Sequence, residues 1–197
     1  MQRTTLLLLA VLALAALAAA PAEAKLKKTT ALPAMRWDAA PHGAEWTKEA
    51  LVLVADHDGE LTNRVPADIE VYCPGYATAT KDARRAFWVG LLSATAKYES
   101  GFNPAAVGGR GRYVGLMQIS LPTARNYACD ATSAAGLKDG AANLSCALDI
   151  VAPHVAADAM VAGTGNRGIA RDWGPWQSGK NRAAIASWTR VQTYCQP

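Results

Sequence analysis

One nine-residue segment near the middle of the chain decides the fold: Ala96-Lys97-Tyr98-Glu99-Ser100-Gly101-Phe102-Asn103-Pro104. Ahead of it, apolar residues recur at helical spacing around most of the girth, which predicts a buried helix over residues 81–99. Gly101 and Pro104 end this helix. Glu99 therefore lies in the last turn, where burial and the negative pole of the helix dipole both disfavour an ionised carboxylate. We expect a raised pKa, as a general acid needs, although a solvated glutamate at a frayed helix end is the alternative.

A second motif follows a glycine-rich loop and reads Gly115-Leu116-Met117-Gln118-Ile119, with Pro122-Thr123-Ala124 close behind. Together with residues 99–104, it resembles the soluble lytic transglycosylase (SLT) family, which shares the goose-type lysozyme-like fold and cleaves peptidoglycan. The resemblance covers roughly residue 81 to the helix after Asn143. It implies a mainly α, lysozyme-like (goose-type/SLT) helical domain, here expected over residues 81–197, with residues 25–80 as an N-terminal helical extension packed on its core.

The resemblance also implies a reaction, which is cleavage of the β-1,4 bond between N-acetylmuramic acid (MurNAc) and N-acetylglucosamine (GlcNAc). Glu99 would be the single acid and base, first protonating the glycosidic oxygen and then taking a proton from the C6 hydroxyl of MurNAc. That hydroxyl attacks within its own sugar and closes a 1,6-anhydro ring, so its effective concentration is high. Ser100, Met117 and Gln118 would bind substrate, and we expect no cofactor and no metal.

The sequence departs from the family pattern in ways that leave alternatives open. The loop before Gly115 is one residue longer than usual, and Gly108 stands where serine is common. The family's Ala-Tyr-Asn motif, whose tyrosine supports the catalytic glutamate, has no clean match over residues 155–176, and Tyr127 or Trp173 could replace that tyrosine. One alternative function is a hydrolytic muramidase of the same fold, whose second carboxylate would be Asp130 or Asp172. The other is a non-catalytic peptidoglycan-binding module.

Several other polar and aromatic residues receive weaker predictions. The resemblance gives Asn143 a structural role in holding loops together. Trp173 and Trp176 either stack on sugar faces or pack in the core, with core packing favoured for at least one of them. No catalytic role is expected for the isolated histidines His42, His57 and His154.

Composition and the first residues indicate an exported globular protein. A hydrophobic content of 51% and a charged content of 18% argue against disorder, and a net charge of +4 without a basic cluster argues against a nucleic-acid partner. Residues 1–24 have the basic start, apolar run and Ala22-Glu23-Ala24 ending of a signal peptide. We therefore expect a periplasmic monomer, cleaved near Ala24, with no stable membrane anchor; a retained anchor is the alternative.

The chain contains four cysteines. An even number in an exported chain indicates disulfides, and four cysteines allow three connectivities. We favour Cys129–Cys146, which closes a short loop, with Cys73–Cys195 tying two distant parts together. A zinc site is less consistent with the sequence because there is no CxxC pair.

The remaining segments give a coarse outline. Apolar spacing predicts helices over residues 45–55, 68–72, 144–155 and 182–191, with Pro153 either kinking the third helix or starting another. Asp68 and Glu70 are more typical of a solvated face than of a site. Residues 25–41 have no clear period, which indicates a mobile leader or a loose strap. Residues 163–168 match GxGxxG, but no strand precedes them, so a surface loop is predicted.

Overall fold

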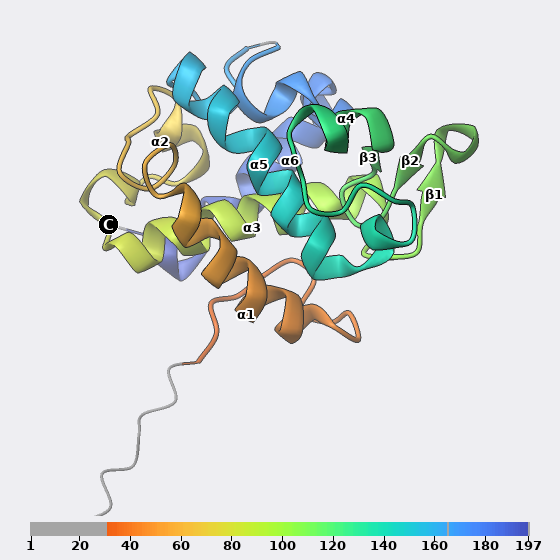
Figure 1. Cartoon of the computed structure of the whole chain (residues 1–197). Coiled ribbons are helices and arrows are strands. Elements are labelled where there is room, and N and C mark those ends of the chain that lie inside the picture. Colours follow the sequence, from red (N-terminus) through yellow and green to blue (C-terminus); the bar gives the residue numbers. More distant parts are fainter. Residues whose placement is uncertain (1–30, 165, 197) are drawn as a thin grey trace, which may run out of the picture. The chain divides into compact units, whose positions relative to one another are not determined.

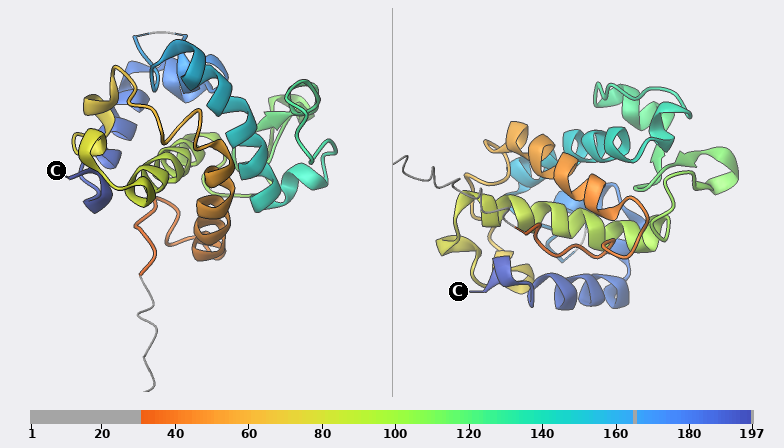
Figure 2. Two further views of the ribbon diagram at one scale, coloured as in Figure 1. Left: turned by 60° about the vertical axis from the view of Figure 1, so that its left-hand side comes forward. Right: turned by 90° about the horizontal axis from the view of Figure 1, so that it is seen from below.

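Helix α3 (Lys81–Glu99) lies in the middle of the fold, between α1 on one side and α6 on the other (Figures 1 and 2). The computed structural model describes residues 31–164 and 166–196, so the predicted leader at residues 1–24 lies outside the described part. Thr80 begins α3 by accepting a hydrogen bond from the backbone N–H of Ala83. Every residue from Ala86 to Ala96 is buried, which explains why the helix is apolar around its girth.

The other helices surround α3, and all of them except α4 lie close to predicted segments. They are α1 (Gly43–Leu53), α2 (Ile69–Tyr72), α4 (Leu121–Asn126), α5 (Gly140–Asp158) and α6 (Gly179–Thr189). Helix α5 continues through Pro153 as one element and ends where Ala159 takes a left-handed conformation. The described chain is therefore mainly helical, as predicted. Single-turn 3₁₀ helices lie between these elements at Val54–His57, Tyr76–Thr78, Gly109–Gly111, Gly136–Lys138, Gly168–Arg171, Gly174–Gln177 and Thr193–Cys195.

A small antiparallel sheet lies beyond the C-terminal end of α3 (Figure 1). Its strands are β1 (Val107–Gly108), β2 (Tyr113–Val114) and β3 (Ile119–Ser120), in that order. Val107 pairs with Val114, and Val114 with Ile119. Strands of two residues leave no alternating pattern, so the sequence indicated only a flexible loop here.

The segment before α1 is packed into the core, so the prediction of a mobile leader or loose strap is wrong for residues 31–41. Met35 and Trp37 are buried. The indole N–H of Trp37 donates a hydrogen bond of 2.9 Å to Thr47 Oγ1, and its ring meets Trp46 edge to face. The segment has no helical or strand periodicity in its sequence, but the contact between two buried tryptophan rings holds it against the core.

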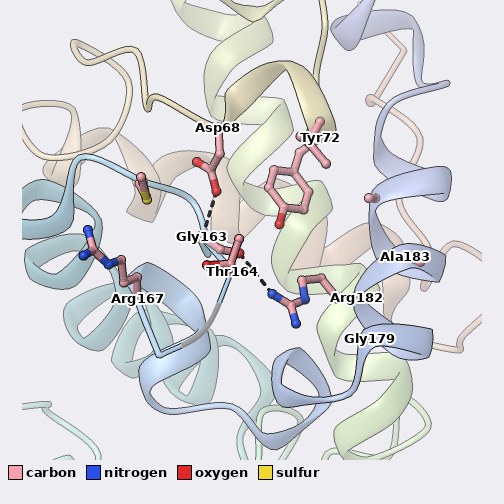
Figure 3. Close-up of a pocket in the computed structure, with 11 residues that line it drawn as sticks. Asp68, Tyr72, Gly163, Thr164, Arg167, Gly179, Arg182 and Ala183 are labelled. Atoms are coloured by element: carbon pink, nitrogen blue, oxygen red, sulfur yellow. Dashed lines mark hydrogen bonds between the residues drawn. The ribbon is translucent and has the colours of Figure 1, made fainter.

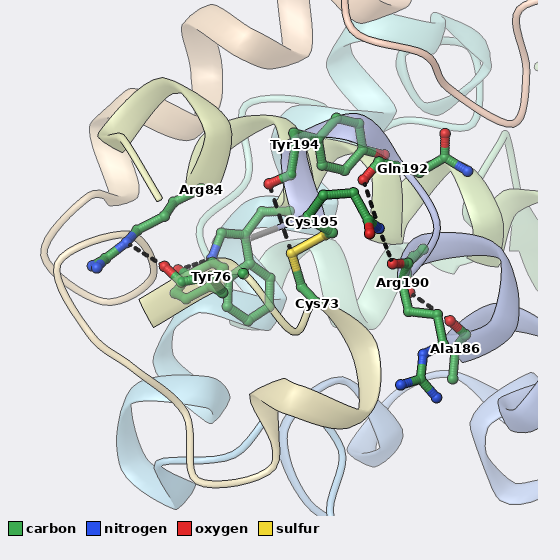
Figure 4. The surroundings of a disulfide bond; sticks show 12 residues. Cys73, Tyr76, Arg84, Ala186, Arg190, Gln192, Tyr194 and Cys195 are labelled. Atoms are coloured by element: carbon green, nitrogen blue, oxygen red, sulfur yellow. Dashed lines mark hydrogen bonds between the residues drawn. A yellow bond between two sulfur atoms is a disulfide. The ribbon is translucent and has the colours of Figure 1, made fainter. Parts of the chain in front are cut away.

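The structure pairs Cys73 with Cys195 and Cys129 with Cys146, which is the connectivity that the sequence favoured. The first disulfide joins the end of α2 to the last 3₁₀ turn (Figure 4). The backbone supports the same junction, because the N–H of Gly75 donates to the carbonyl of Cys195 over 2.8 Å.

The last 3₁₀ turn also packs directly on α3. Tyr194 lies so close to Gly90 that a Cβ on this glycine would sit 2.2 Å from the tyrosine hydroxyl. The same hydroxyl donates to the carbonyl of Ala34. A glycine in the middle of α3 therefore permits the close approach of a segment more than a hundred residues away in sequence.

Candidate active site

Glu99 is the last residue of α3 and is partly buried. The pKa of its carboxyl is raised from 4.5 to about 7, and burial is the cause. Among the residues that the structure describes, neither a hydrogen bond nor a neighbouring charge contributes to this shift. The carboxyl is thus an acid that is still about half protonated near neutral pH.

The chain reverses direction directly after Glu99. Gly101 and Phe102 both take the left-handed conformation, with φ angles of 60° and 68°. Ser100 is partly buried, and its hydroxyl donates to the carbonyl of Ala96 over 3.3 Å. The predicted partner of that hydroxyl was the Glu99 carboxylate or the substrate, so in this structure Ser100 instead completes the last turn of the helix.

Asn143 on α5 holds the motif over residues 115–119 in place. Its side-chain oxygen accepts from the N–H of Met117 over 2.8 Å, and its amide donates to the carbonyls of Val114 and Leu137. Gly115 has a φ of 86°, and a Cβ there would lie 2.2 Å from the amide nitrogen of Asn143. The structural role predicted for Asn143 is confirmed, and it explains why a glycine is needed two residues before Met117.

Met117 does not lie where a substrate-binding side chain would. It is completely buried, and its carbonyl accepts a 2.8 Å hydrogen bond from the indole of Trp173. The sequence predicted that this side chain binds the substrate, and a completely buried side chain does not fit that role. Trp176 is also completely buried and donates to Thr95 Oγ1, so it packs in the core and does not stack on a sugar.

Gln118 remains partly exposed beside the sheet. Its amide donates to the carbonyls of Ala106 and Gly115, which fixes the side chain. A Cβ on Gly108 would lie 2.4 Å from Gln118 Oε1, so a serine at position 108 would require this glutamine to move. Gln118 lines a small cavity of about 40 Å³ together with Tyr113, Ile119, Ser120, Thr123, Ile150, Asp172 and Trp173.

A polar cluster at the same cavity was missed by sequence reasoning. Tyr127 Oη and Asp172 Oδ2 lie 2.5 Å and 3.1 Å from the same nitrogen, Nε2 of His154. Burial raises the pKa of Asp172. The three residues come from α4, α5 and the turn before Trp173, and no sequence spacing relates them. Tyr127 and Trp173 each bond elsewhere, so neither takes the position of a tyrosine on Glu99.

The other predicted carboxylate, Asp130, lies away from Glu99. Burial raises the pKa of Asp149, and the charge of Asp130 adds to this shift; Asp149 also lies 3.5 Å from His57. Within residues 31–164 and 166–196, no three histidine, cysteine or acidic side chains are grouped so that they could hold a metal ion. No helix in the same ranges is long and apolar enough to cross a membrane.

The comparisons with known proteins agree with this geometry. Residues 77–156 match the family model of the transglycosylase SLT domain. Structures of Bd0314 DslA, one wild-type form and two glutamate-to-glutamine mutants, each match with a TM-score of 0.76 and 26% identity. Each match covers 85% of this chain and 100% of DslA. No curated protein matches in sequence.

The SLT domain accounts for the features around Glu99. It includes all of α3, the sheet and most of α5, which are the elements that position Glu99, Gln118 and Asn143. Such a domain indicates activity of the lytic transglycosylase family on peptidoglycan. Residues 77–156 of this chain therefore match a transglycosylase SLT domain, and the described chain has a lysozyme-like helical fold.

Proposed function

We propose that this protein is an exported lytic transglycosylase that cleaves the MurNAc–GlcNAc β-1,4 bond and uses Glu99 as its single acid and base. The observation that carries the proposal is the pKa of about 7 at Glu99, caused by burial. A group with a pKa near the working pH can both give and take a proton in one cycle. A carboxylate paired with a cation or with hydrogen-bond donors would stay ionised and could not start the reaction.

The proposed reaction has two steps that balance. Glu99 donates its proton to the glycosidic oxygen, and the bond from the anomeric carbon to that oxygen breaks as the GlcNAc hydroxyl leaves. The N-acetyl group of MurNAc assists this departure. The C6 hydroxyl of MurNAc then attacks the anomeric carbon, and its proton returns to Glu99. The product carries a 1,6-anhydro ring, and no water is consumed.

The supporting residues take different parts in this proposal. Gln118 is the side chain best placed to meet sugar hydroxyls, because it is partly exposed and its amide is held from two sides. Met117 contributes through its backbone, which links Asn143 to Trp173. Ser100 keeps the last turn of α3 closed around Glu99.

The strongest alternative is a hydrolytic muramidase, because Asp172 shares a cavity with Gln118 and has a raised pKa. Hydrolysis needs a second carboxyl group about 5–5.5 Å or about 6.5–9.5 Å from the first. A carboxylate at the shorter distance, in a partly buried site, would shift the pKa of Glu99 by its charge. Burial is the cause of that shift, and neither Asp172 nor Asp130 contributes to it, which favours the single-acid reaction.

Analysis of the products decides between these functions. Purified peptidoglycan is digested with the wild type, Glu99→Gln and Asp172→Asn, and the released fragments are weighed by mass spectrometry. We expect anhydro ends from the wild type and from Asp172→Asn, and no release by Glu99→Gln. Reducing ends, heavier by one water, would establish the muramidase. Binding without release by all three proteins would establish a non-catalytic module.

Export, cleavage and the monomeric state belong to the same proposal. The two disulfides support an oxidising compartment such as the periplasm. We expect the mature chain to begin near Lys25 after removal of residues 1–24, with residues 25–80 as the extension and 81–197 as the catalytic domain. N-terminal sequencing of the protein from a periplasmic extract, and its mass in solution by light scattering, test these statements.

A further inference from the structure

A cavity lies apart from the predicted catalytic and substrate-binding residues, because none of Glu99, Ser100, Met117 or Gln118 lines it. It has a volume of about 670 Å³, within the range of pockets that hold small ligands. Helix α2, the loop after α5 and helix α6 form its walls (Figure 3). Its floor and sides are mostly apolar, and the polar groups come from a few residues: Asp68, Tyr72, Thr164, Arg167 and Arg182.

Asp68 builds one wall of this cavity. Its carboxylate accepts hydrogen bonds from three successive backbone N–H groups, those of Val161, Ala162 and Gly163, at 2.6, 3.1 and 2.8 Å. The prediction of a solvated face is therefore wrong for this residue. These donors satisfy the carboxylate and fix the loop, and the charge of Asp68 still reaches Tyr72 on the same wall.

The loop that Asp68 holds is the glycine-rich segment predicted to lie on the surface. Gly163, Thr164 and Arg167 of this segment line the cavity. Arg182 on α6 donates from Nη1 to the carbonyl of Gly163 over 3.0 Å, so the loop is tied on both sides. Gly163 thus forms part of a cavity wall, and the described element before this segment is helix α5 and not a strand.

Helix α6 keeps the space open. Its residues at the cavity include Gly179, Ala183 and Ala186, which recur at the spacing of one helical face. Small side chains on this face leave room that larger ones would fill. The N-terminal end of α6 also directs the positive end of its dipole toward Gly179.

Two observations show that the cavity is suited to an anion. Arg182 keeps further N–H donors beyond the one it gives to Gly163, and its charge reaches Tyr72, while the exposed Arg167 also lines the cavity. Tyr72 is 2% exposed, yet its hydroxyl has no hydrogen-bond partner among the described residues and points into the cavity (Figure 3). Burial raises the pKa of this phenol to about 12, so the hydroxyl is a donor at neutral pH.

We propose that this cavity binds the terminal carboxylate of a short peptide with small apolar side chains. A carboxylate matches the planar donors of an arginine, and the tyrosine hydroxyl supplies a third donor. The apolar walls fit methyl groups beside the carboxylate. The identification of the peptide as a stem of peptidoglycan rests on the proposed function; the chemistry of the cavity does not.

Calorimetric titration of the full mature chain tests this binding with a matched pair of probes. N-acetyl-alanyl-alanine carries the carboxylate, and its C-terminal amide is identical without the charge. We expect the acid to bind about tenfold or more tightly than the amide, since one charge-assisted hydrogen bond is worth about a factor of ten. Inorganic phosphate at equal concentration should not displace the acid, because it has no apolar part.

Substitutions of residues that line the cavity test whether the probe binds there. Arg167→Gln and Tyr72→Phe remove donors that make no hydrogen bond within the described protein, and each should weaken binding of the acid several-fold while the fold is kept. Ala183→Trp should abolish binding of both probes by filling the space. Glu99→Gln should bind as the wild type does, so a failure of the proposed catalysis would leave this result unchanged.

Three outcomes would overturn the proposal: equal binding of acid and amide, displacement of the acid by phosphate, or full affinity in both Arg167→Gln and Tyr72→Phe. Absence of any binding by the wild type at millimolar probe would overturn it as well. Circular dichroism of each variant confirms that a loss of affinity comes from the cavity and not from unfolding.

Discussion

The two ends of helix α3 hold two carboxyl groups in opposite states. Beside the first turn, Asp58 accepts from Arg85 Nε over 3.0 Å and from Thr62 over 2.6 Å, and Lys81 lies 3.5 Å away. These partners, Arg85 first, lower its pKa to about 2. At the last turn, burial without such partners raises the pKa of Glu99 to about 7.

The difference teaches what separates a structural carboxylate from a reactive one. Asp58 has its charge satisfied, so it contributes to stability and does not give up a proton near neutral pH. Glu99 is partly buried and, among the described residues, has neither a cation nor a hydrogen-bond donor to stabilise its charge. Its ionisation therefore lowers the stability of the folded protein, and the carboxyl group keeps its proton up to neutral pH. One helix thus contacts a structural carboxylate at its first turn, Asp58, and ends on a partly buried one, Glu99, and each can be substituted without changing the other.

The largest effect is expected from Glu99→Gln. This change removes the transferable proton and keeps the size of the side chain, so the release of fragments from peptidoglycan should fall about 10²- to 10⁴-fold. Asp58→Asn, the matched change at the other end of α3, should leave the rate per folded molecule within about twofold. A similar loss of rate in both variants would contradict the division of roles.

The pH dependence of the reaction is the next test. The first step needs the protonated form of Glu99, whose pKa is about 7. The rate should therefore decline by about tenfold per pH unit above pH 7. Initial rates on solubilised glycan strands, measured from pH 5 to 9, check this slope. A rate that stays flat to pH 9 would show that another group supplies the proton.

Asp58→Asn should act on stability instead. The folded pKa of Asp58 is depressed below its usual 3.8, so its contribution is present at neutral pH and is lost as the pH falls below about 4 toward 2. We expect a loss of about 1–2 kcal/mol in the free energy of unfolding at pH 7. Urea unfolding at pH 7 measures it, and Asp82→Asn, a more exposed neighbour of Arg85, is the control.

The smallest effect is a stability gain at Glu99. The folded pKa lies above the unfolded one, so the folded state loses stability as the pH rises from about 4.5 through 7. Glu99→Gln has no such loss and should exceed the wild type by about 1 kcal/mol at pH 8, with a smaller difference at pH 5. Thermal unfolding at both pH values provides the comparison. Identical pH dependence in the two proteins would mean that Glu99 is not buried as described.

The local part of this arrangement could be predicted from sequence, and the long-range part could not. The bounds of α3 follow from its apolar spacing and from the glycine and proline after Glu99, and the structural role of Asn143 follows from the family motif. The disulfide pairing was favoured because one short loop was obvious. The signals for α3 and for the short disulfide loop are local, whereas Asn143 was identified by the family motif and Cys73–Cys195 by elimination once the short loop was assigned.

Contacts between distant segments left no such signal. Asp68 binds backbone groups 93 to 95 residues away, and His154 joins two residues from separate elements. The motif predicted that Met117 contacts the substrate. In the structure its side chain is completely buried, and its carbonyl accepts a hydrogen bond from the indole of Trp173. A pattern of residue types cannot distinguish a side chain that faces a groove from its neighbour that faces the core.

The bond between Cys73 and Cys195 has a consequence for the timing of maturation. It encloses Glu99 and two walls of the large cavity, the loop after α5 and helix α6, in one covalent ring of the chain, whereas Asp68 and Tyr72 precede this ring. Such a ring cannot close until its second cysteine has left the ribosome and reached an oxidant, and closure removes about 4–5 kcal/mol worth of freedom from the unfolded chain. Molecules in a reducing compartment therefore lack this disulfide, and they acquire their full resistance to unfolding only after they meet an oxidant.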